Sequence, residues 1–269
     1  MHRYVVKRIF MMIPVIIGVS MFVFFTMKLA PGDPARMVAG SEASEAAVQK
    51  IREELGLDKP VLYQYVRYMA NLLHGDMGLS YTSGKDVAGE IASRLPATVK
   101  LASCGMIVAV AIAIPIGILS ATKQYSIADN VSMVMALIGV SMPNFWLGLL
   151  LIIVFSLKLG FLPSGGSEGL KSLILPSWTI GVGSAANITR MTRSSMLEVI
   201  RQDYIRTVRA KGVNEKKVIL RHALRNALIP VVTVIGLQMG TLLGGAVVTE
   251  TVFSWPGIGR LMIESIKKK

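Results

Sequence analysis

The stretch that decides the fold is Thr98–Ala121, with the sequence TVKLASCGMIVAVAIAIPIGILSA. It is almost entirely apolar, and it is long enough to cross the roughly 30 Å of hydrocarbon in a bilayer, which takes about 20 residues of helix. Four further apolar runs meet the same expectation: Ile9–Leu29, Val131–Leu157, the shorter Leu173–Ile188, and Ala227–Val248. The sequence therefore predicts an all-α protein, a polytopic transmembrane helical bundle with five spans.

The composition supports a membrane protein and excludes several other classes. Hydrophobic residues make up 52% of the 269 residues and charged residues only 17%, against about 25% charged residues in soluble domains. The mean hydropathy is +0.56. Apolar content this high excludes a disordered chain, and a single cysteine excludes a disulfide scaffold. The net charge of +13 fits a soluble nucleic-acid binder, but the hydropathy does not.

The distribution of basic residues gives the expected orientation. The segment 190–226 holds ten basic residues against three acidic ones, and the N-terminus before the first span is also basic. Because basic loops stay in the cytoplasm, we expect both of them there. The roughly neutral segment Pro31–Pro96 then lies outside. The first apolar run is too long for a signal peptide and no A-x-A cleavage site follows it, so we expect a retained span.

The predicted organisation has three parts. They are the N-terminal tail and first span at 1–30, an extracytoplasmic helical segment at 31–96, and a core at 97–269 with spans at about 98–121, 131–157, 173–188 and 227–248 and the cytoplasmic loop 190–226. In the outer segment, Ser44 is expected to cap a helix that ends before Gly56, and Pro60 to begin another. The basic tail Lys267–Lys269 would lie outside, against the positive-inside rule, as if a further span were missing.

The cytoplasmic segment predicts an amphipathic helix. It begins at Ser194 or Ser195 and runs to about Lys211, Gly212 ends it, and Asn214 caps a second helix. One face of the first helix is apolar and consists of Met196, Val199, Ile200, Tyr204 and Val208. Arginines occupy the other side. Such a helix either lies on the anionic inner leaflet or docks into a groove on another protein, and composition alone leaves both interpretations open.

Two motifs lie within the predicted spans. The fifth span carries Gly236, Gly240 and Gly244, whose spacing lets another helix approach closely, within the chain or in a second subunit. The third span is interrupted by Met142, Pro143, Asn144, Phe145 and Trp146. The proline removes a helical hydrogen bond, and carbonyls freed at membrane depth are tolerated only where protein or water satisfies them. The break is therefore either a structural kink or part of a wet translocation path.

Residues suited to catalysis are not brought together by any motif. The histidines His2, His74 and His222 fall in different segments, and no metal-ligand spacing occurs. No G-x-x-x-x-G-K-[ST] sequence is present, so we expect no ATP bound through a P-loop. No Asp, Glu or Arg lies in the middle of a span, which disfavours a proton relay or a carrier driven by an intramembrane carboxylate. We expect no catalytic residue, no metal and no cofactor bound by this chain.

A series of short motifs follows a recognisable order along the chain. They are Pro31–Pro34 (PGDP), Leu55–Asp58 (LGLD), Gly75–Gly78 (GDMG), the Pro143, Phe145 and Trp146 set, Asp203–Gly212 (DYIRTVRAKG), His222–Pro230 (HALRNALIP) and Phe253–Gly259 (FSWPGIG). Together they resemble the peptide and nickel branch of bacterial ABC importer permeases, the inner-membrane components of binding-protein-dependent transport systems. The long outer segment after the first span resembles that of the B-type member of the permease pair.

The resemblance implies a role for the cytoplasmic loop. Its helix would be the coupling helix, seated in a cleft of a separate ATPase subunit, with positions 196, 199, 200, 204 and 208 in buried contact. The coupling loop consists of Tyr204, Arg206, Thr207, Val208, Arg209, Ala210, Lys211 and Gly212. The wider family has an E-A-A-x-x-x-G signature here. Arg206 and Thr207 are usual for the peptide branch, whereas Val208 replaces a small residue.

The resemblance also implies partners. They would be a second homologous permease in a heterodimer, two ABC ATPase subunits that bind ATP and Mg²⁺, an extracytoplasmic solute-binding protein and the lipid bilayer of the bacterial inner membrane, with no nucleic acid. The substrate would be a dipeptide, an oligopeptide or a related small solute, with nickel chelates and glutathione-like solutes also open. Members of this branch continue past the position of Gly259 into another span, so one alternative is a truncated remnant that inserts without coupling. A separate alternative is a carrier or channel that needs no ATPase.

Overall fold

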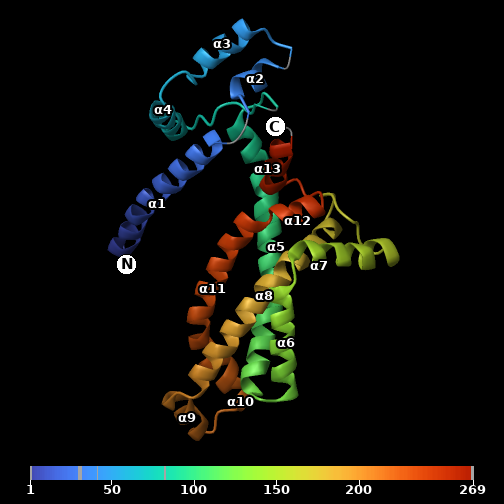
Figure 1. Cartoon of the computed structure of the whole chain (residues 1–269). Helices are drawn as coiled ribbons and strands as arrows, with labels where there is room; N and C mark the ends of the chain where they lie inside the picture. Colours follow the sequence, from blue (N-terminus) through green and yellow to red (C-terminus); the bar gives the residue numbers. More distant parts are fainter. Residues whose placement is uncertain (1, 30–31, 41, 82, 268–269) are drawn as a thin grey trace. The chain divides into compact units, whose positions relative to one another are not determined.

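The computed structural model describes residues 2–29, 32–40, 42–81 and 83–267 (Figure 1). These are helices joined by turns and loops, with one isolated β-bridge between Leu79 and Asp86, so the all-α prediction is confirmed. Pro31, Lys268 and Lys269, which the sequence singled out, lie outside the described residues. The chain forms two units, residues 1–92 with 265–269 and residues 93–264, and each is described by itself.

The first unit contains α1 (His2–Leu29), α2 (Pro34–Ala39), α3 (Glu45–Glu54) and α4 (Val61–Leu73). The predicted helix boundaries are confirmed here. Ser44 caps α3, with its Oγ accepting a hydrogen bond from the Ala47 amide at 3.3 Å. Gly56 follows α3 with a positive φ of 69°, which glycine adopts without steric cost. Pro60 precedes the first residue of α4.

Aromatic contacts hold α4 against α1. Tyr65 of α4 is buried, and its ring meets that of Phe24 edge-on with 5.4 Å between the centroids. The Tyr65 hydroxyl lies 2.9 Å from the Ser20 Oγ. Asp33 caps α2 and also pairs with Arg52 of α3 at 2.7 Å. The predicted outer segment therefore folds back on the predicted first span.

The second unit contains the rest of the helices. They are α5 (Val87–Thr122, which begins in the first unit), α6 (Ile127–Ser141), α7 (Asn144–Leu151), the π-helix η1 (Ile152–Lys158), α8 (Lys171–Ile200), α9 (Asp203–Ala210), α10 (Glu215–Lys217), the π-helix η2 (Val218–Ala223), α11 (Leu224–Gly245), α12 (Val247–Val252) and α13 (Ile258–Lys267). Within this unit, α9 and α10 lie at one end of α8 and α11, and α12 lies at the other end (Figure 1).

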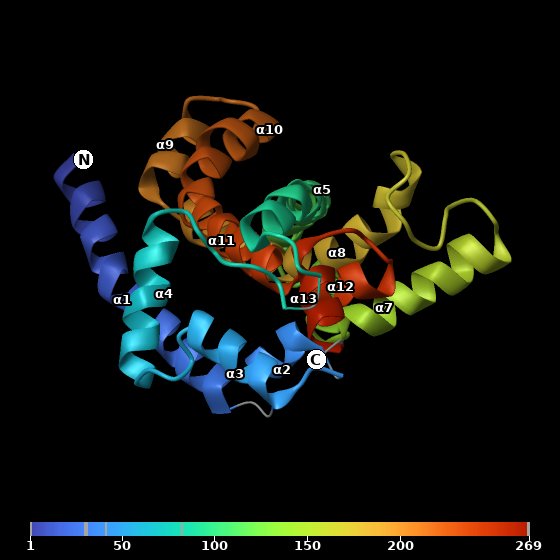
Figure 2. The ribbon, with the colours of Figure 1, turned by 90° about the horizontal axis from the view of Figure 1, so that it is seen from above.

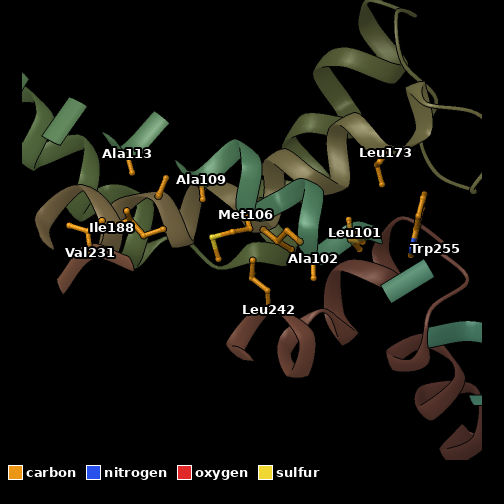
Figure 3. Packing of buried hydrophobic residues seen from close by; sticks show 12 residues of the cluster. Leu101, Ala102, Met106, Ala109, Ala113, Leu173, Ile188, Val231, Leu242 and Trp255 are labelled. Carbon is orange, nitrogen blue, oxygen red and sulfur yellow. The ribbon is translucent and has the colours of Figure 1, made fainter. Parts of the chain in front are cut away.

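Helix α8 is the centre of the second unit. It packs against α6, α7 and α11, and it approaches α5 closely because α5 carries glycine at the crossing points. A Cβ on Gly105 would lie 2.6 Å from Ile180 Cδ1, and one on Gly117 would lie 2.6 Å from Thr192 Cβ. The core then continues between the helices as buried aliphatic side chains (Figure 3). Those labelled there include Leu101, Met106 and Ala109 of α5, Ile188 of α8, and Val231 and Leu242 of α11.

Three described helices are long and apolar enough to cross a membrane: Val6–Leu29, Val87–Thr122 and Glu215–Gly245. The predicted third span is a pair of helices bent by 102°. The bend arises because Met142 and Pro143 take extended backbone conformations, with ψ of 122° and 133°. Helix α7 still packs against α8 near the break, and the chain beyond it extends outward to one side in both views (Figures 1 and 2).

The predicted fourth span, 173–188, lies within α8, which is longer than expected and is not among the three apolar helices. Its buried face carries small hydroxyl side chains such as Thr179, Ser184 and Thr192. These lower the hydropathy of the helix but are covered by its neighbours, and Thr179 and Thr192 donate hydrogen bonds to carbonyls one turn earlier. The segment is thus a buried central helix rather than a short apolar one.

Candidate functional site

The cytoplasmic segment predicted from the sequence folds as two helices rather than one. Helix α8 ends at Ile200 because Gln202 takes an extended backbone conformation, with φ of −68° and ψ of 147°, and α9 begins after it. The predicted single helix from Ser194 or Ser195 to Lys211 is therefore wrong. Ser195 is a buried residue inside α8 rather than a cap.

The turn after α9 has the predicted boundaries. Gly212 follows the helix with a positive φ of 77°, and the Asn214 side chain caps α10 by accepting a hydrogen bond from the Lys216 amide at 2.9 Å. Arg209 and Glu215 close the turn with two hydrogen bonds of 2.8 and 3.1 Å. These bonds raise the pKa of the Arg209 guanidinium. The turn therefore holds α9 in a fixed position relative to α10.

The apolar face of α9 packs inside its own chain. Ile205 is fully buried, and Val208 is half-buried against the same cluster. The buried members of this cluster are Ala121, Met196, Ile205, Val218, Ile219, Ala223 and Ala227, with Val199 and Ile200 packed against it. The prediction that Met196 contacts another protein is wrong, because α9 folds back and the chain itself covers this side chain completely.

The opposite face of α9 is exposed and basic. Of the predicted coupling loop, the exposed residues are Tyr204, Arg206, Thr207, Arg209, Ala210, Lys211 and Gly212. Arg206 makes a long, exposed ion pair with Asp203 at 3.5 Å. The Tyr204 hydroxyl accepts a hydrogen bond from the Asn226 amide group at 2.7 Å and so ties α9 to the start of α11. The loop thus exposes a polar surface, and the Tyr204–Asn226 hydrogen bond connects it to α11.

A buried ion pair lies at the same end of the unit. Asp129 of α6 is 1% exposed, and the Arg193 guanidinium of α8 donates two hydrogen bonds of 2.7 Å to its carboxylate. Ser120 of α5 and the Tyr125 amide also donate to it. One carboxylate therefore joins α5, α6 and α8 near α9. Sequence reasoning missed this pair, since its members are 64 residues apart and no local pattern relates them.

A groove that carries several polar side chains runs between α8 and α11, although most of its lining is apolar, and its smaller part also reaches α6 and the start of α7. It consists of two adjoining cavities of about 560 and about 230 Å³ that share Asn187 and Gln238. The larger is completed by Arg190, Met191, Ser194, Val234 and Leu237, and the smaller by Gly139, Val140, Met142, Asn144, Ile180, Gly183, Ser184, Thr241, Leu242 and Gly245. In a largely apolar unit, such a lining offers hydrogen bonds to a polar solute.

The predicted translocation residues are only partly brought to this groove. Met142 and Asn144 line its smaller cavity. Phe145 and Trp146 belong to α7, where their side chains are about half exposed, and they do not line it. Pro143 is exposed at the break between α6 and α7. Two of the five predicted residues, Met142 and Asn144, therefore line the groove, whereas Phe145 and Trp146 are exposed on α7 outside it.

Sequence reasoning missed three polar groove residues, Asn187, Arg190 and Gln238. The signal was present in α8, where Ser184, Asn187, Arg190 and Ser194 recur at spacings of three or four residues and so share one face of a helix. It was overlooked because the predicted span ended at 188, which left Arg190 in the basic loop. In the structure this residue lies well within α8.

The glycines Gly236, Gly240 and Gly244 of α11 form an exposed face of that helix. A Cβ on Gly236, Gly240 or Gly244 would meet no atom within 4 Å among the described residues. This contrasts with Gly105 and Gly117 of α5, where atoms of α8 occupy the space that a Cβ would need. Of the two options that the sequence left open, packing within the chain is therefore not the one observed in the described part of the molecule.

The FSWPGIG motif (Phe253–Gly259) forms a buried junction at the opposite end of the unit. Glu250 of α12 is fully buried, and its carboxylate accepts hydrogen bonds from the Thr98 hydroxyl at 2.7 Å and the Arg260 amide at 3.0 Å. Trp255 is also buried and donates from its indole Nε1 to the Ala97 carbonyl at 2.9 Å. The motif therefore joins α12 and α13 to α5.

These features define a class of protein. Within the described ranges, no group of three or more His, Cys, Asp or Glu side chains is placed to hold a metal ion. The described residues form long apolar helices, a groove with several polar side chains beside the central helix, and an exposed basic loop at one end. This combination is typical of an integral membrane transport protein.

The family follows from comparison with known proteins. Residues 113–269 match the family described as binding-protein-dependent transport system inner membrane component, and residues 1–102 match its N-terminal region. The chain belongs to this family. It is a transmembrane permease subunit of an ABC importer, it is not itself an enzyme, and ATP is hydrolysed by partner ATPases. The family also implies a solute-binding protein as a partner and a multi-pass location in the inner membrane.

Several relatives carry the comparison further. The chain is 47% identical over 269 residues to the glutathione transport system permease protein GsiC of Escherichia coli (strain K12), covering 100% of this chain and 88% of the relative. The glutathione transport system permease protein GsiC of Shigella flexneri serotype 5b (strain 8401) is 46% identical, again over 100% of this chain and 88% of the relative. An inward-facing structure of the MetNI methionine ABC transporter is similar in fold, with a TM-score of 0.55 and 22% identity over 66% of this chain and 81% of that one.

Proposed function

We propose that this chain forms half of the translocation path for glutathione or a related short peptide. The proposal is supported by the names of its relatives and by the groove between α8 and α11, whose amide and hydroxyl side chains suit a solute rich in peptide groups. The N-terminus and the part of the predicted loop 190–226 that follows α8 face the cytoplasm, and the segment 31–96 faces outward. The solute-binding protein delivers the solute from that outer side.

The loop from Tyr204 to Gly212 is the surface that a partner ATPase contacts. The observation that carries this assignment is that α9 buries its apolar face in its own chain and exposes its basic face. The ATPase contact is consequently polar and depends on the position of α9 rather than on a free hydrophobic stripe. ATP and Mg²⁺ are bound by the two ATPase subunits and not by this chain.

Movement of the ATPases reaches the groove through contacts behind the loop. The Tyr204–Asn226 hydrogen bond connects α9 to α11, and the Asp129–Arg193 pair connects α6 to α8. Helices α8 and α11 form the two walls of the groove. A shift of α9 therefore alters the separation of the walls, and the path alternates between outward and inward access.

The coupling assignment is tested at Gly212. Its positive φ of 77° is strained for a β-branched residue but is tolerated by asparagine. We expect Gly212→Val to displace the turn and reduce solute-stimulated ATP hydrolysis by the reconstituted complex at least 10-fold, whereas Gly212→Asn stays within about 2-fold of wild type. A Cβ at this exposed position meets no described atom within 4 Å, so we expect both variants to insert normally.

The measurement is co-purification of the ATPase subunits together with ATP hydrolysis in proteoliposomes. Equal ATPase binding and hydrolysis by the Val and Asn variants would show that the loop is not the coupling surface. Membrane insertion, followed by the yield of folded permease, separates loss of coupling from loss of folding.

A further inference from the structure

The groove between α8 and α11 contains one charged side chain among its lining residues, that of Arg190. Its neighbours in the larger cavity are the apolar Met191, Val234 and Leu237 and the polar Asn187 and Gln238. The chain thus places a permanent positive charge on the wall of the groove, in surroundings that are otherwise neutral.

Arg190 has no acidic partner in the described structure. Arg193 and Arg209 at this end are paired with Asp129 and Glu215, whereas Arg201 donates to the Gln124 amide oxygen rather than to a carboxylate. What distinguishes Arg190 is its place in the groove lining. It donates one hydrogen bond, from Nη2 to the Asn187 Oδ1 at 2.8 Å, and its side chain is exposed. This bond holds the guanidinium beside the part of the groove that both cavities share, and it leaves further N–H groups of the guanidinium for an incoming acceptor.

We propose that Arg190, oriented by Asn187 and flanked by the amide of Gln238, binds a carboxylate group of the solute as it passes along the groove. A planar guanidinium donates two parallel hydrogen bonds to a carboxylate, which gives orientation as well as affinity. The neighbouring amides match the peptide groups of the same solute. The inference deepens the proposed function, on which it rests, by naming an anionic solute and the residue that selects it.

An anionic lipid phosphate offers similar oxygens to an arginine near a membrane interface. The groove favours the solute, because the shared residues Asn187 and Gln238 provide amide contacts that a lipid headgroup on a lipid-facing surface does not need. The two sources are separated by the lipid composition of the vesicles used in the test.

The first experiment measures import of labelled glutathione by the complete complex in proteoliposomes. We expect Arg190→Gln to reduce import at least 10-fold, in line with the loss of a charged hydrogen-bonded contact. The yield of assembled complex should stay within about 2-fold of wild type, because the Arg190 side chain is exposed, and this separates loss of import from loss of folding. Lys123→Gln is the matched control, because it removes an exposed charge at the same end of the unit outside both cavities, and it should import normally.

The vesicle composition decides between solute and lipid. The import defect of Arg190→Gln should be the same in purely zwitterionic vesicles and in vesicles with anionic lipid. A defect confined to anionic vesicles assigns the residue to a lipid phosphate and overturns the proposal, as does import by Arg190→Gln equal to wild type.

A second experiment does not depend on the transported substrate. Ser194 lines the larger cavity, and Cys104 is the chain's single cysteine, so Ser194→Cys in a Cys104→Ala chain gives one reporter thiol. An anionic methanethiosulfonate should react faster relative to a cationic one when Arg190 is present, and Arg190→Gln should lower this ratio about 10-fold. An unchanged ratio refutes the anion site, whereas a lowered ratio without glutathione import would refute only the proposed substrate.

Discussion

At the scale of single residues, the junction formed by Glu250 shows why the FSWPGIG motif contains two glycines. The fully buried carboxylate is satisfied by Thr98 and by the backbone of α13, and the Thr98 hydroxyl in turn accepts a hydrogen bond from the Ile258 amide at 2.9 Å. A Cβ on Gly257 would overlap the Glu250 carboxylate. The glycines therefore leave room for a buried polar group that would be costly without its partners.

The junction predicts a large effect at Gly259. A Cβ there would lie 2.5 Å from the Val247 Cα, a backbone atom that cannot rotate away. We expect Gly259→Ala to lower the free energy of unfolding of the purified subunit by about 1–3 kcal/mol, the usual cost of overpacking. Gly244→Ala, which meets no atom within 4 Å, should not destabilise it. Thermal unfolding in detergent measures both, and equal melting temperatures would contradict the described packing.

The buried ion pair predicts an asymmetric response. Arg193→Ala leaves the Asp129 carboxylate buried without its counter-charge, which costs about 3–5 kcal/mol of stability. Arg201→Ala removes an exposed hydrogen bond to Gln124 at the end of the same helix and should cost within about 0.5 kcal/mol. Chemical unfolding of the subunit in micelles compares them. A loss for Arg193→Ala no larger than that for Arg201→Ala would show that the pair does not hold α6 to α8.

At the scale of elements, local sequence patterns predicted helix caps better than they predicted how many helices a segment forms. Ser44, Gly56, Gly212 and Asn214 act as expected because capping depends on residues within one turn. The apolar stripe from Met196 to Val208 instead suggested one helix where two are present. Both α8 and α9 place apolar residues in the cluster that contains Met196 and Ile205. The helical spacing of apolar residues therefore continues across the bend, and the sequence pattern does not reveal where one helix ends.

Pairings between distant segments were beyond local patterns. The Asp129–Arg193 contact and the Glu250 junction join residues far apart in the sequence, and only the packing of α5, α6, α8 and α12 brings them together. The length of α8 was underestimated because hydropathy treats its buried hydroxyl groups as signs of exposure. The overall class, by contrast, was predictable, since long apolar helices and a segregated basic loop are properties of the sequence itself.

At the scale of the whole molecule, two of the surfaces that the described residues expose are suited to protein partners. One is the exposed basic face of α9, and the other is the glycine face of α11, which the described residues leave uncovered. A glycine face of this kind lets the backbone of a neighbouring helix approach closely. We predict that a second permease subunit packs on this face.

This assignment predicts a selective loss of assembly. Gly240→Ile should leave the unfolding free energy of the isolated subunit within about 1 kcal/mol, because a Cβ there meets no described atom within 4 Å and the position is exposed. It should nevertheless reduce co-purification of the second permease at least 10-fold. Gly18→Ile in α1, another glycine with no neighbour within 4 Å, serves as the control. Retention of the second permease by Gly240→Ile would place the interface elsewhere.

Helix α8 has a mechanical consequence for the transport cycle. Its 30 residues form one helix from Lys171 to Ile200, with Pro176 near its start, which corresponds to a rod of about 45 Å at 1.5 Å per residue. If such a rod pivots by about 10° around one end, its other end sweeps roughly 8 Å. A small rotation imposed beside α9 would therefore be amplified into an opening comparable to the width of a peptide, with no helix having to unwind.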